Sequence, residues 1–331
     1  MRDEIPSSDL TAAGPPQGGG PIPVRGTQRP SATTRLVGVI GWPVEHSLSP
    51  ALHGAAFAAL ELDYAYVPLP VAPDRVGDAV RGLRALGFRG ANVTIPHKAA
   101  VLPHLDWLER DAALAEAVNT IVVEDDGTLR GYNTDIVGFL RALDEVLGAQ
   151  GGGAKGEDGP GGAPPMPGAP PLAPGAPALI LGAGGAARAA ALALARRGAS
   201  LTVVNRTRLH AERLADLVSS AVPGATVAVA SPDDLDAALV ASQRLLVNAT
   251  SLGMTGASKV PRGLADNVTA GQVVADFVYT RGLTDLLAQA QAQGATIVDG
   301  LSVLVWQAAA AFELWTGVRA PVDAMCRAVG R

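Results

Sequence analysis

Apolar and polar positions follow one another in short blocks that predict alternating strands and helices. Between residues 35 and 147, short runs rich in apolar residues are typical of strands at Leu36–Ile40, Tyr64–Leu69, Ala91–Ile95, Thr120–Glu124 and Thr128–Gly131. The last two flank Asp125-Asp126-Gly127, so we expect a hairpin there. Ser49-Pro50 predicts a helix start with Ser49 as the N-cap, and Pro96 predicts another helix start. A helical stripe from Ile136 to Leu147 completes an expected α/β domain.

The alternation becomes more regular after residue 177. Six short strands are predicted at residues 178–181, 200–204, 226–230, 245–248, 273–277 and 296–298. Helical segments separate most of these strands, which is the arrangement that a parallel, doubly wound sheet requires. The pattern therefore predicts two α/β domains in one chain.

The composition separates these domains from two segments of another kind. The chain has 331 residues with 39 Gly and 25 Pro, and residues 148–177 alone hold ten Gly and eight Pro. That segment and residues 1–34 lack apolar periodicity, so neither can bury enough surface to offset the entropy of ordering. We therefore predict a disordered tail over 1–34 and a flexible linker over 148–177 that joins the two folded domains.

The charge and cysteine content exclude several classes of function. The net charge is −5 and the basic residues are dispersed, which argues against a nucleic-acid-binding surface. The single cysteine, Cys326, excludes an internal disulfide framework, and the five histidines do not have metal-ligand spacing, so no metal is expected. No signal peptide is visible, and Gly and Arg interrupt the longest apolar run, so no membrane span is expected. These features are compatible with the cytoplasm.

A glycine-rich turn follows the first predicted strand of the second domain. Gly182-Ala183-Gly184-Gly185-Ala186-Ala187 matches the G-x-G-x-x-G/A dinucleotide fingerprint, directly after a strand and before an Ala-rich helix. Such a turn lets the backbone approach a pyrophosphate, which free N–H groups at the helix N-terminus then bind. After the next strand, where NAD sites usually place a carboxylate, the chain reads Asn205-Arg206-Thr207. Because Arg206 can bind a 2′-phosphate, NADP is favoured over NAD.

Four polar segments of the first domain lie at strand ends or tight turns, where proteins often present binding residues. They contain Ser47 and Ser49, the segment from Asn92 to Lys98, Asn119, and Asp135. Each also has a structural interpretation, because Ser and Asp are good N-caps, Asn suits a turn, and a lone Lys is usually a surface charge. Only three of the 26 basic residues are lysines, and a desolvated Lys, unlike Arg, can lose its proton near neutral pH. This composition favours a chemical role for Lys98.

Taken in order, these segments resemble the shikimate dehydrogenase family. The resemblance covers about residues 36–330 apart from the predicted linker. Besides the turn at 182–186 and Asn205-Arg206-Thr207, it rests on Gly41-Trp42-Pro43, Ser47-Leu48-Ser49-Pro50, Gly90 to Lys98, Ala117 to Thr120, Gly131 to Asp135, Asn248 to Ser251, Asp299-Gly300-Leu301 and Trp306 to Ala309. Each motif is short, but the set in this order is specific.

The resemblance implies an NADP-dependent oxidoreductase that reversibly reduces 3-dehydroshikimate to shikimate, in chorismate and aromatic amino acid biosynthesis. It implies that Lys98 and Asp135 form the catalytic pair and that Asp135 also contacts the substrate. The other implied substrate-binding residues are Ser47, Ser49, Thr94, Asn119, Tyr279 and Gln307. The implied cofactor-binding residues are Gly182, Ala183, Gly184, Gly185, Ala186, Asn205, Arg206, Thr207, Phe277 and Gly300.

The same resemblance implies how the domains are built. The C-terminal helices would return to the first domain, which gives a discontinuous substrate-binding domain of residues 35–147 plus 301–331. Residues 178–300 would form a Rossmann-type NADP-binding domain. The protein would act on a small molecule, without nucleic acid or membrane partners, as a monomer or homodimer.

Three alternatives stay open from the sequence. A quinate/shikimate dehydrogenase using NAD would prefer an acidic residue near Asn205, and the family often has a further Arg where this chain has His210. An aminoshikimate-type dehydrogenase would differ in few contacts. Loss of Lys98 or Asp135 would indicate a non-catalytic NADP-binding regulator, and both residues are present.

Overall fold

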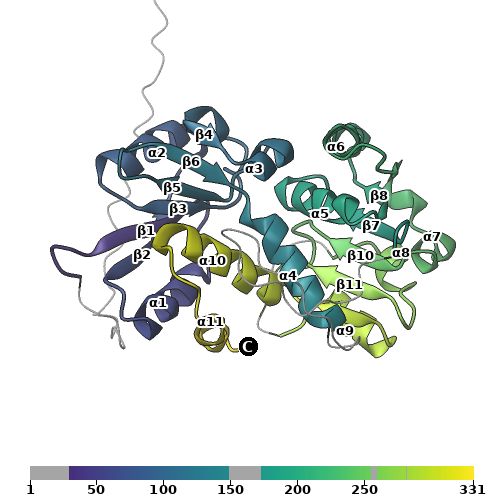
Figure 1. The fold of residues 1–331 in the computed structure, drawn as a ribbon. Helices are drawn as coiled ribbons and strands as arrows, with labels where there is room; N and C mark the ends of the chain where they lie inside the picture. Colours follow the sequence, from purple (N-terminus) through teal and green to yellow (C-terminus); the bar gives the residue numbers. More distant parts are fainter. Residues whose placement is uncertain (1–29, 149–172, 255–258, 281) are drawn as a thin grey trace, which may run out of the picture.

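Two six-stranded sheets, each flanked by helices, make up the computed structural model (Figure 1). The structure describes residues 30–148, 173–254, 259–280 and 282–331. The predicted tail over 1–34 and linker over 148–177 lie mostly outside these residues. Among the described helices, none is long and apolar enough to cross a membrane. The prediction of two α/β sheets in one chain is confirmed.

The first sheet is mixed and has the strand order β2-β1-β3-β5-β6-β4. Its strands are β1 (Arg35–Gly41), β2 (Tyr64–Pro70), β3 (Gly90–Val93), β4 (Trp107–Leu108), β5 (Thr120–Val123) and β6 (Leu129–Tyr132). β5 and β6 form the expected antiparallel hairpin. β5 is also antiparallel to β3, with Asn92 opposite Thr120. The end of β3 and the start of β5 therefore meet at one edge of the sheet.

Helices from both ends of the described chain cover this sheet. They are α1 (Ser49–Ala59), α2 (Val76–Ala85), α3 (Arg110–Ala115), α4 (Thr134–Gly148), α10 (Gly300–Thr316) and α11 (Val322–Ala328), with short 3-10 turns at Pro73–Arg75 and Leu102–His104. α10 packs against α4, and α11 packs against α1 (Figure 1). A Cβ atom at Gly138 would lie 2.6 Å from Cβ of Gln307, so glycine permits the close approach of α4 and α10.

The second sheet is parallel and has the order β12-β11-β10-β7-β8-β9. Its strands are β7 (Pro177–Leu181), β8 (Ser200–Val204), β9 (Val227–Ala230), β10 (Leu245–Asn248), β11 (Val273–Asp276) and β12 (Thr296–Val298). Its helices are α5 (Gly185–Arg196), α6 (Arg208–Ala221), α7 (Ala237–Ala241), α8 (Arg262–Ala265) and α9 (Asp285–Ala292), with a 3-10 turn at Pro232–Asp234. This doubly wound order changes direction between β7 and β10, which is where such sheets bind nucleotides.

Two local predictions were wrong. Ser49 is not the N-cap of its helix, because α1 begins at Ser49 itself and Leu48 occupies the cap position without a side-chain cap. Pro96 does not start a helix, because residues 96–101 form turns. The backbone carbonyl of Lys98 accepts a hydrogen bond from the N–H of Val118 at 2.8 Å. In a helix that carbonyl would be bonded four residues ahead, so the contact with Val118 replaces the helix.

Candidate active site

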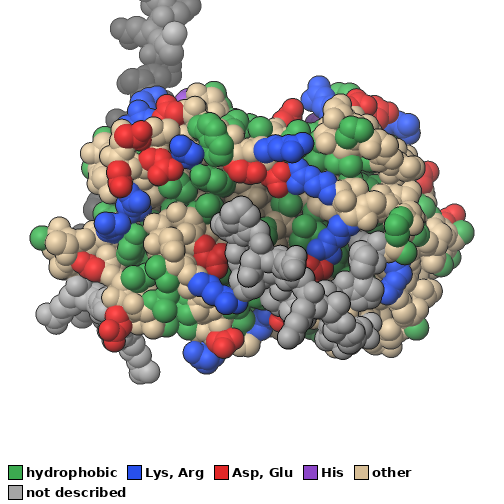
Figure 2. Space-filling view, in the orientation of Figure 1, with side chains coloured by type: hydrophobic (Ala, Val, Ile, Leu, Met, Phe, Trp, Pro, Cys, Tyr) green, Lys and Arg blue, Asp and Glu red, His purple; other side chains and the backbone are tan. Residues whose placement is uncertain are grey.

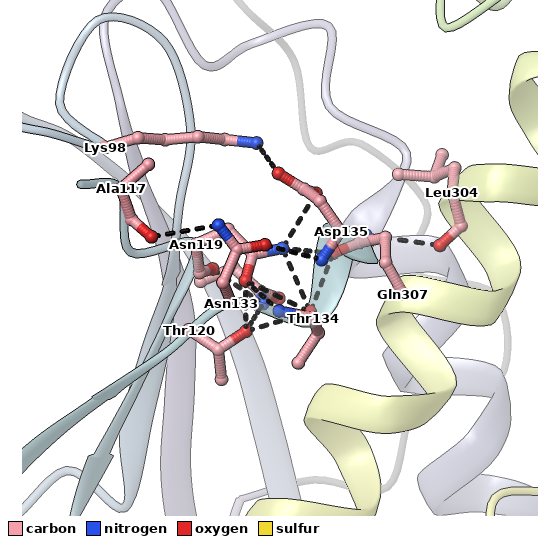
Figure 3. A network of polar contacts seen from close by, with 10 residues as sticks. Lys98, Ala117, Asn119, Thr120, Asn133, Thr134, Asp135, Leu304 and Gln307 are labelled. Carbon is pink, nitrogen blue, oxygen red and sulfur yellow. Dashed lines mark hydrogen bonds and ion pairs between the residues drawn. The ribbon is translucent and has the colours of Figure 1, made fainter. Parts of the chain in front are cut away.

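An ion pair between Lys98 and Asp135 lies at the centre of the candidate site. Lys98 follows β3, and Asp135 lies in the first turn of α4. Nζ of Lys98 donates a hydrogen bond to Oδ2 of Asp135 (Figure 3). The two side chains are only 19% and 9% exposed. Charges removed from water in this way are costly unless their remaining hydrogen-bonding groups are satisfied, so the surroundings of Asp135 decide whether the pair is stable.

Asn119, the residue before β5, connects Asp135 to helix α10. Its Nδ2 lies 2.8 Å from Oδ1 of Asp135 and 3.1 Å from Oε1 of Gln307. Its Oδ1 accepts the backbone N–H of Thr134 at 2.7 Å. All these side chains are buried. Both oxygens of the carboxylate are therefore bonded, and the structure brings together Lys98, Asp135, Asn119 and Gln307 from four separate segments (Figure 3).

Asn133 explains why Asp135 is available to Lys98. The side-chain Oδ1 of Asn133 accepts the backbone N–H of Asp135 at 3.1 Å, and its Nδ2 donates to the carbonyl of Ala117 at 2.9 Å. Asn133 precedes α4 and accepts an N–H of its first turn, so it acts as the N-cap of this helix. The carboxylate of Asp135 is free to bind Lys98 and Asn119 instead.

The residues expected to bind a carboxylate lie in a second group near the start of α1. Oγ of Ser47 accepts the backbone N–H of Ser49 at 3.3 Å. Burial raises the pKa of Tyr66, and a hydrogen bond with the buried Ser49 side chain lowers it in part, while nearby Tyr279 raises it. Burial also raises the pKa of Tyr279. Tyr66 is therefore the shared neighbour of Ser49 and Tyr279.

Asn92 belongs to the polar cluster but was not among the predicted site residues. It is buried at the end of β3, where its Nδ2 donates to Oγ1 of Thr120 at 3.1 Å and its Oδ1 accepts the hydroxyl of Tyr66 at 2.7 Å. The signal in the sequence was an amide inside the apolar run Ala91–Ile95, because a buried amide needs several hydrogen-bond partners.

Three predicted residues lie outside the hydrogen-bonded cluster. Within the described residues, no side-chain hydrogen bond joins Ser47, Thr94 or Tyr279 to Asp135. Thr94 is half-buried immediately after β3, and its N–H bonds to the carbonyl of Ile40 at 2.9 Å. These side chains are therefore not bonded to the carboxylate at the centre of the cluster.

The glycine-rich turn between β7 and α5 lies against Lys98. Gly182 has φ of +115°, and a Cβ there would lie 2.9 Å from Cγ2 of Thr250. A Cβ at Gly185 would lie 3.4 Å from Cδ of Lys98, whereas a Cβ at Gly184 would face open space. The free N–H groups at the start of α5 and the open side of the turn fit a pyrophosphate. The predicted nucleotide-binding turn and the ion pair are thus neighbours.

Helix α5 and its C-cap residue, Arg197, also form ion pairs with the first half of the molecule. Arg188 bonds to Glu116 at 2.9 Å, and Arg197 bonds to Asp144 at 2.5 Å. Arg196 forms a third pair with Asp111. Figure 2 shows basic and acidic side chains side by side where the halves containing α3 and α5 meet. These pairs attach the helix that follows the glycine-rich turn to both α3 and α4.

The segment after β8 is more open. Nδ2 of Asn205 donates to the carbonyl of Thr207 at 2.9 Å, and Arg208 pairs with Glu212 at 2.8 Å. Arg206 and Thr207 are exposed, and within the described residues no hydrogen bond or ion pair engages the guanidinium of Arg206. This exposed cation fits the phosphate of an adenosine group.

Two further predicted cofactor residues lie between the sheets. Phe277, which follows β11, packs on Phe139 of α4 with ring centroids 5.3 Å apart. Gly300 begins α10, and a Cβ there would lie 2.5 Å from the carbonyl oxygen of Val278.

In the described part of the chain, no group of three or more His, Cys, Asp or Glu residues is arranged to hold a metal ion.

The fold and the site together define the class of a dinucleotide-dependent dehydrogenase, with a Rossmann-type sheet beside a buried Lys–Asp pair. Family models match three parts of the chain. Residues 39–121 match the shikimate dehydrogenase substrate binding domain, residues 173–258 match shikimate/quinate 5-dehydrogenase, and residues 300–329 match the shikimate 5'-dehydrogenase C-terminal domain.

Whole-chain relatives give the same result. A shikimate dehydrogenase (NADP(+)) of Methanopyrus kandleri is 44% identical over 90% of this chain and 96% of its own length. A shikimate dehydrogenase solved in complex with NADP+ is 36% identical, with a TM-score of 0.78 over 92% of this chain and 97% of that one. One from Thermus thermophilus, solved with NADP(H) and shikimate, is 34% identical, with a TM-score of 0.71 over 89% and 98%. The chain belongs to the shikimate dehydrogenase family.

The fold alone does not separate the members of this family by substrate. A quinate dehydrogenase from Corynebacterium glutamicum, in complex with NAD, is 29% identical and has a TM-score of 0.75 over 89% of this chain and 98% of that one. The substrate therefore has to be argued from the residues of the site.

Proposed function

We propose that this protein is an NADP-dependent shikimate dehydrogenase, which reversibly reduces 3-dehydroshikimate to shikimate. The observation that carries the proposal is the buried Lys98–Asp135 pair, bonded to Asn119 and adjacent to the glycine-rich turn. A ketone reduction needs a hydride at the carbonyl carbon and a proton at its oxygen. A pair of this kind beside a nucleotide-binding turn supplies the proton donor where the hydride arrives.

Lys98 and Asp135 are the proposed catalytic pair. When NADPH is bound, its nicotinamide supplies the hydride. The Lys98 ammonium stabilises the negative charge that develops on the carbonyl oxygen and gives that oxygen its proton, and in the reverse direction the neutral amine takes the proton back. Asp135 holds the ammonium and the substrate hydroxyl in place. The hydrogen bond from Asn119 supports this role, because it fixes the carboxylate.

The remaining predicted residues divide between the two ends of the substrate. We propose that Ser47, Ser49 and Tyr279 bind its carboxylate and that Thr94, Asn119 and Gln307 bind its ring oxygens. The position of Ser49 and Tyr279 beside the half-buried Tyr66 supports the first set. The shared contact of Asn119 with Gln307 and Asp135 supports the second.

The cofactor residues follow from the second sheet. We propose that Gly182, Ala183, Gly184, Gly185 and Ala186 bind the pyrophosphate. Asn205, Arg206 and Thr207 would bind the adenosine and its 2′-phosphate. Phe277 and Gly300 would lie beside the nicotinamide. The exposed guanidinium of Arg206 supports NADP rather than NAD, because it offers a phosphate a cation without breaking an existing pair.

The domain boundaries and the cytoplasmic location of the protein are part of the same proposal. Residues 35–147 plus 301–331 would form the substrate domain, and 178–300 the cofactor domain. The packing of α10 on α4 supports the first assignment. A single cysteine suits the reducing cytoplasm.

A matrix of two substrates and two cofactors tests the proposal. Shikimate and quinate are each incubated with NADP+ and with NAD+, and formation of the reduced nicotinamide is followed by its absorbance. We expect the highest kcat/KM for shikimate with NADP+. A preference for quinate with NAD+ would assign the protein to the quinate branch, and tight NADP binding without turnover of either substrate would indicate a non-catalytic regulator.

A further inference from the structure

We propose that Tyr66 is a positioning residue of the active site, because its hydroxyl starts a directed series of hydrogen bonds that orients Asn119 toward Asp135. The inference rests on the proposed function for its kinetic test, although the order of the hydrogen bonds follows from the contacts alone. Tyr66 lies on β2, a strand that is distant in the sequence from both Lys98 and the glycine-rich turn.

The series begins between strands β2 and β3 of the first sheet, which lie on either side of β1. The hydroxyl of Tyr66 lies 2.7 Å from Oδ1 of Asn92. A carbonyl oxygen can only accept, so Tyr66 is the donor. This bond holds the oxygen of the Asn92 amide toward Tyr66 and its NH2 group toward β5. There, Nδ2 donates to Oγ1 of Thr120 at 3.1 Å and to the carbonyl of Asn119 at 3.2 Å.

The direction of donation continues to the catalytic carboxylate. Oγ1 of Thr120 receives the bond from Asn92 and donates to Oδ1 of Asn119 at 3.2 Å. The same oxygen accepts the backbone N–H of Thr134 at 2.7 Å. With its oxygen held by Thr120 and Thr134, Asn119 presents Nδ2 to Oδ1 of Asp135 at 2.8 Å, and Lys98 binds the other carboxylate oxygen. Reversing one amide would place two acceptors or two donors face to face. The direction of donation is therefore fixed from Tyr66 to Asp135, whose other oxygen accepts from Lys98.

Aromatic packing holds Tyr66 where it can start the series. Its ring is stacked on His53 with centroids 4.5 Å apart and an interplanar angle of 4°, and Trp315 contacts the pair from α10 at 6.2 Å from Tyr66 and 5.2 Å from His53. His53 is fully buried, and among the described residues neither of its ring nitrogens has a hydrogen-bond partner. His53 therefore acts on Tyr66 through its ring face, and the phenol hydroxyl remains directed to Asn92.

The matched pair Tyr66→Phe and Tyr64→Phe isolates this hydroxyl. Tyr64 lies on the same strand, and its hydroxyl donates to the carbonyl of Trp315 at 3.3 Å, outside the polar cluster. Since a net hydrogen bond contributes about 0.5–1.5 kcal/mol, we expect Tyr66→Phe to lower kcat/KM for shikimate about threefold to tenfold. KM for NADP+ and the thermal midpoint should match those of Tyr64→Phe, whose kcat/KM stays at the wild-type level.

A double-mutant cycle with Asn92→Ala tests whether Tyr66 acts through Asn92. Once Asn92 is removed, we expect Tyr66→Phe to have no further effect on kcat/KM, because the series is already broken. Additive losses would overturn the proposal, as would a Tyr66→Phe enzyme within twofold of wild type. A parallel loss in NADP+ binding and thermal stability would show a structural role instead and would also overturn it.

An NMR measurement separates this inference from the proposed activity. The side-chain NH2 resonances of Asn119, assigned through their loss in Asn119→Asp, should move in Tyr66→Phe and stay in place in Tyr64→Phe. Unmoved resonances in both variants would overturn the inference even if shikimate is turned over. Movement in Tyr66→Phe alone would support it even if the wild-type protein prefers another substrate.

Discussion

Two parts of the candidate site differ in how far the chain's own contacts organise them. We call the cluster around Lys98, Asp135 and Asn119 the ring end and the segment Asn205–Arg208 the adenosine end. Around Asp135 the polar side chains are buried and bonded to one another, and even the oxygen and nitrogen of each amide have assigned partners. After β8, by contrast, Arg206 is exposed, and the bonds of its neighbours stay within the same short segment.

This difference separates two physical tasks. Groups that stabilise charge during a reaction act best when they are already oriented in a site that excludes water, because reorientation then costs nothing at the moment of reaction. An exposed arginine is ordered by the phosphate that it binds, so it contributes to affinity and to the choice of cofactor. We therefore expect substitutions at the ring end to lower turnover and substitutions at the adenosine end to change cofactor preference.

The largest expected effect is the loss of turnover in Lys98→Ala. This change removes the proposed proton donor and leaves the buried Asp135 without its cation. General acid–base catalysis contributes about 10²–10⁴-fold, and we expect kcat to fall within that range while the dissociation constant of NADPH, measured by fluorescence, changes little. Lys98→Arg should also be slow, because Arg keeps the charge but does not release a proton near neutral pH.

Lys259 provides the matched control for Lys98. It is exposed and pairs with Asp285 at 2.8 Å, with side chains 84% and 78% exposed. We expect Lys259→Ala to keep wild-type kcat. Turnover by Lys98→Ala at the rate of Lys259→Ala would remove Lys98 from the catalytic pair.

A smaller effect, limited to the cofactor, is expected for Arg206→Ala. Removing a cation that binds the 2′-phosphate should raise KM for NADP+ about tenfold or more, because charge-assisted hydrogen bonds are among the stronger polar contacts. KM for NAD+ should change less than twofold, and kcat should stay near wild type. Steady-state kinetics with both cofactors measures the ratio, and equal losses with NADP+ and NAD+ would contradict the assignment. Arg81→Ala, which removes an exposed arginine from α2, is the control.

The second sheet is the part of the fold that the sequence predicted best. Its six strands are apolar runs separated by helical segments, and the Gly182 turn marks where its first helix begins. In such a sheet each element is defined by its own local pattern and by its next neighbour, so local reasoning is sufficient. The first sheet contains elements without that local signal, such as the two-residue strand β4 (Trp107–Leu108).

The candidate site was harder to predict because its contacts join distant segments. Motifs identified Lys98, Asp135 and Asn119, and the structure brings them into contact. The bond from Tyr66 to Asn92 depends instead on two strands that are not neighbours in the sheet order and on the helix that stacks His53 against Tyr66. No local pattern records such a contact. The helix predicted at Pro96 failed for the same reason, since Val118 bonds to the carbonyl of Lys98.

A third expected effect concerns the stability of the protein in acid, and it depends on His53. Burial lowers the pKa of His53 to about 3, and the nearby Asn92 side chain opposes this effect only in part. The unfolded chain takes up the proton near the ordinary pKa of about 6.5, whereas the folded protein does not. The unfolded state therefore binds more protons, and stability is lost as the pH falls below about 6.5.

This linkage gives a measurable difference between wild type and His53→Phe. From pH 7 to pH 5, the histidine should reduce the free energy of unfolding by about 2 kcal/mol, and urea denaturation at the two pH values measures the change. His53→Phe keeps a ring against Tyr66 but cannot titrate, so its stability should fall by about 2 kcal/mol less over the same interval. Exposed His210→Asn controls for the loss of a histidine and should follow wild type. If His53→Phe and wild type lose the same stability, water reaches His53 in the folded protein, and the contrast between a closed ring end and an open adenosine end is weaker than its contacts imply.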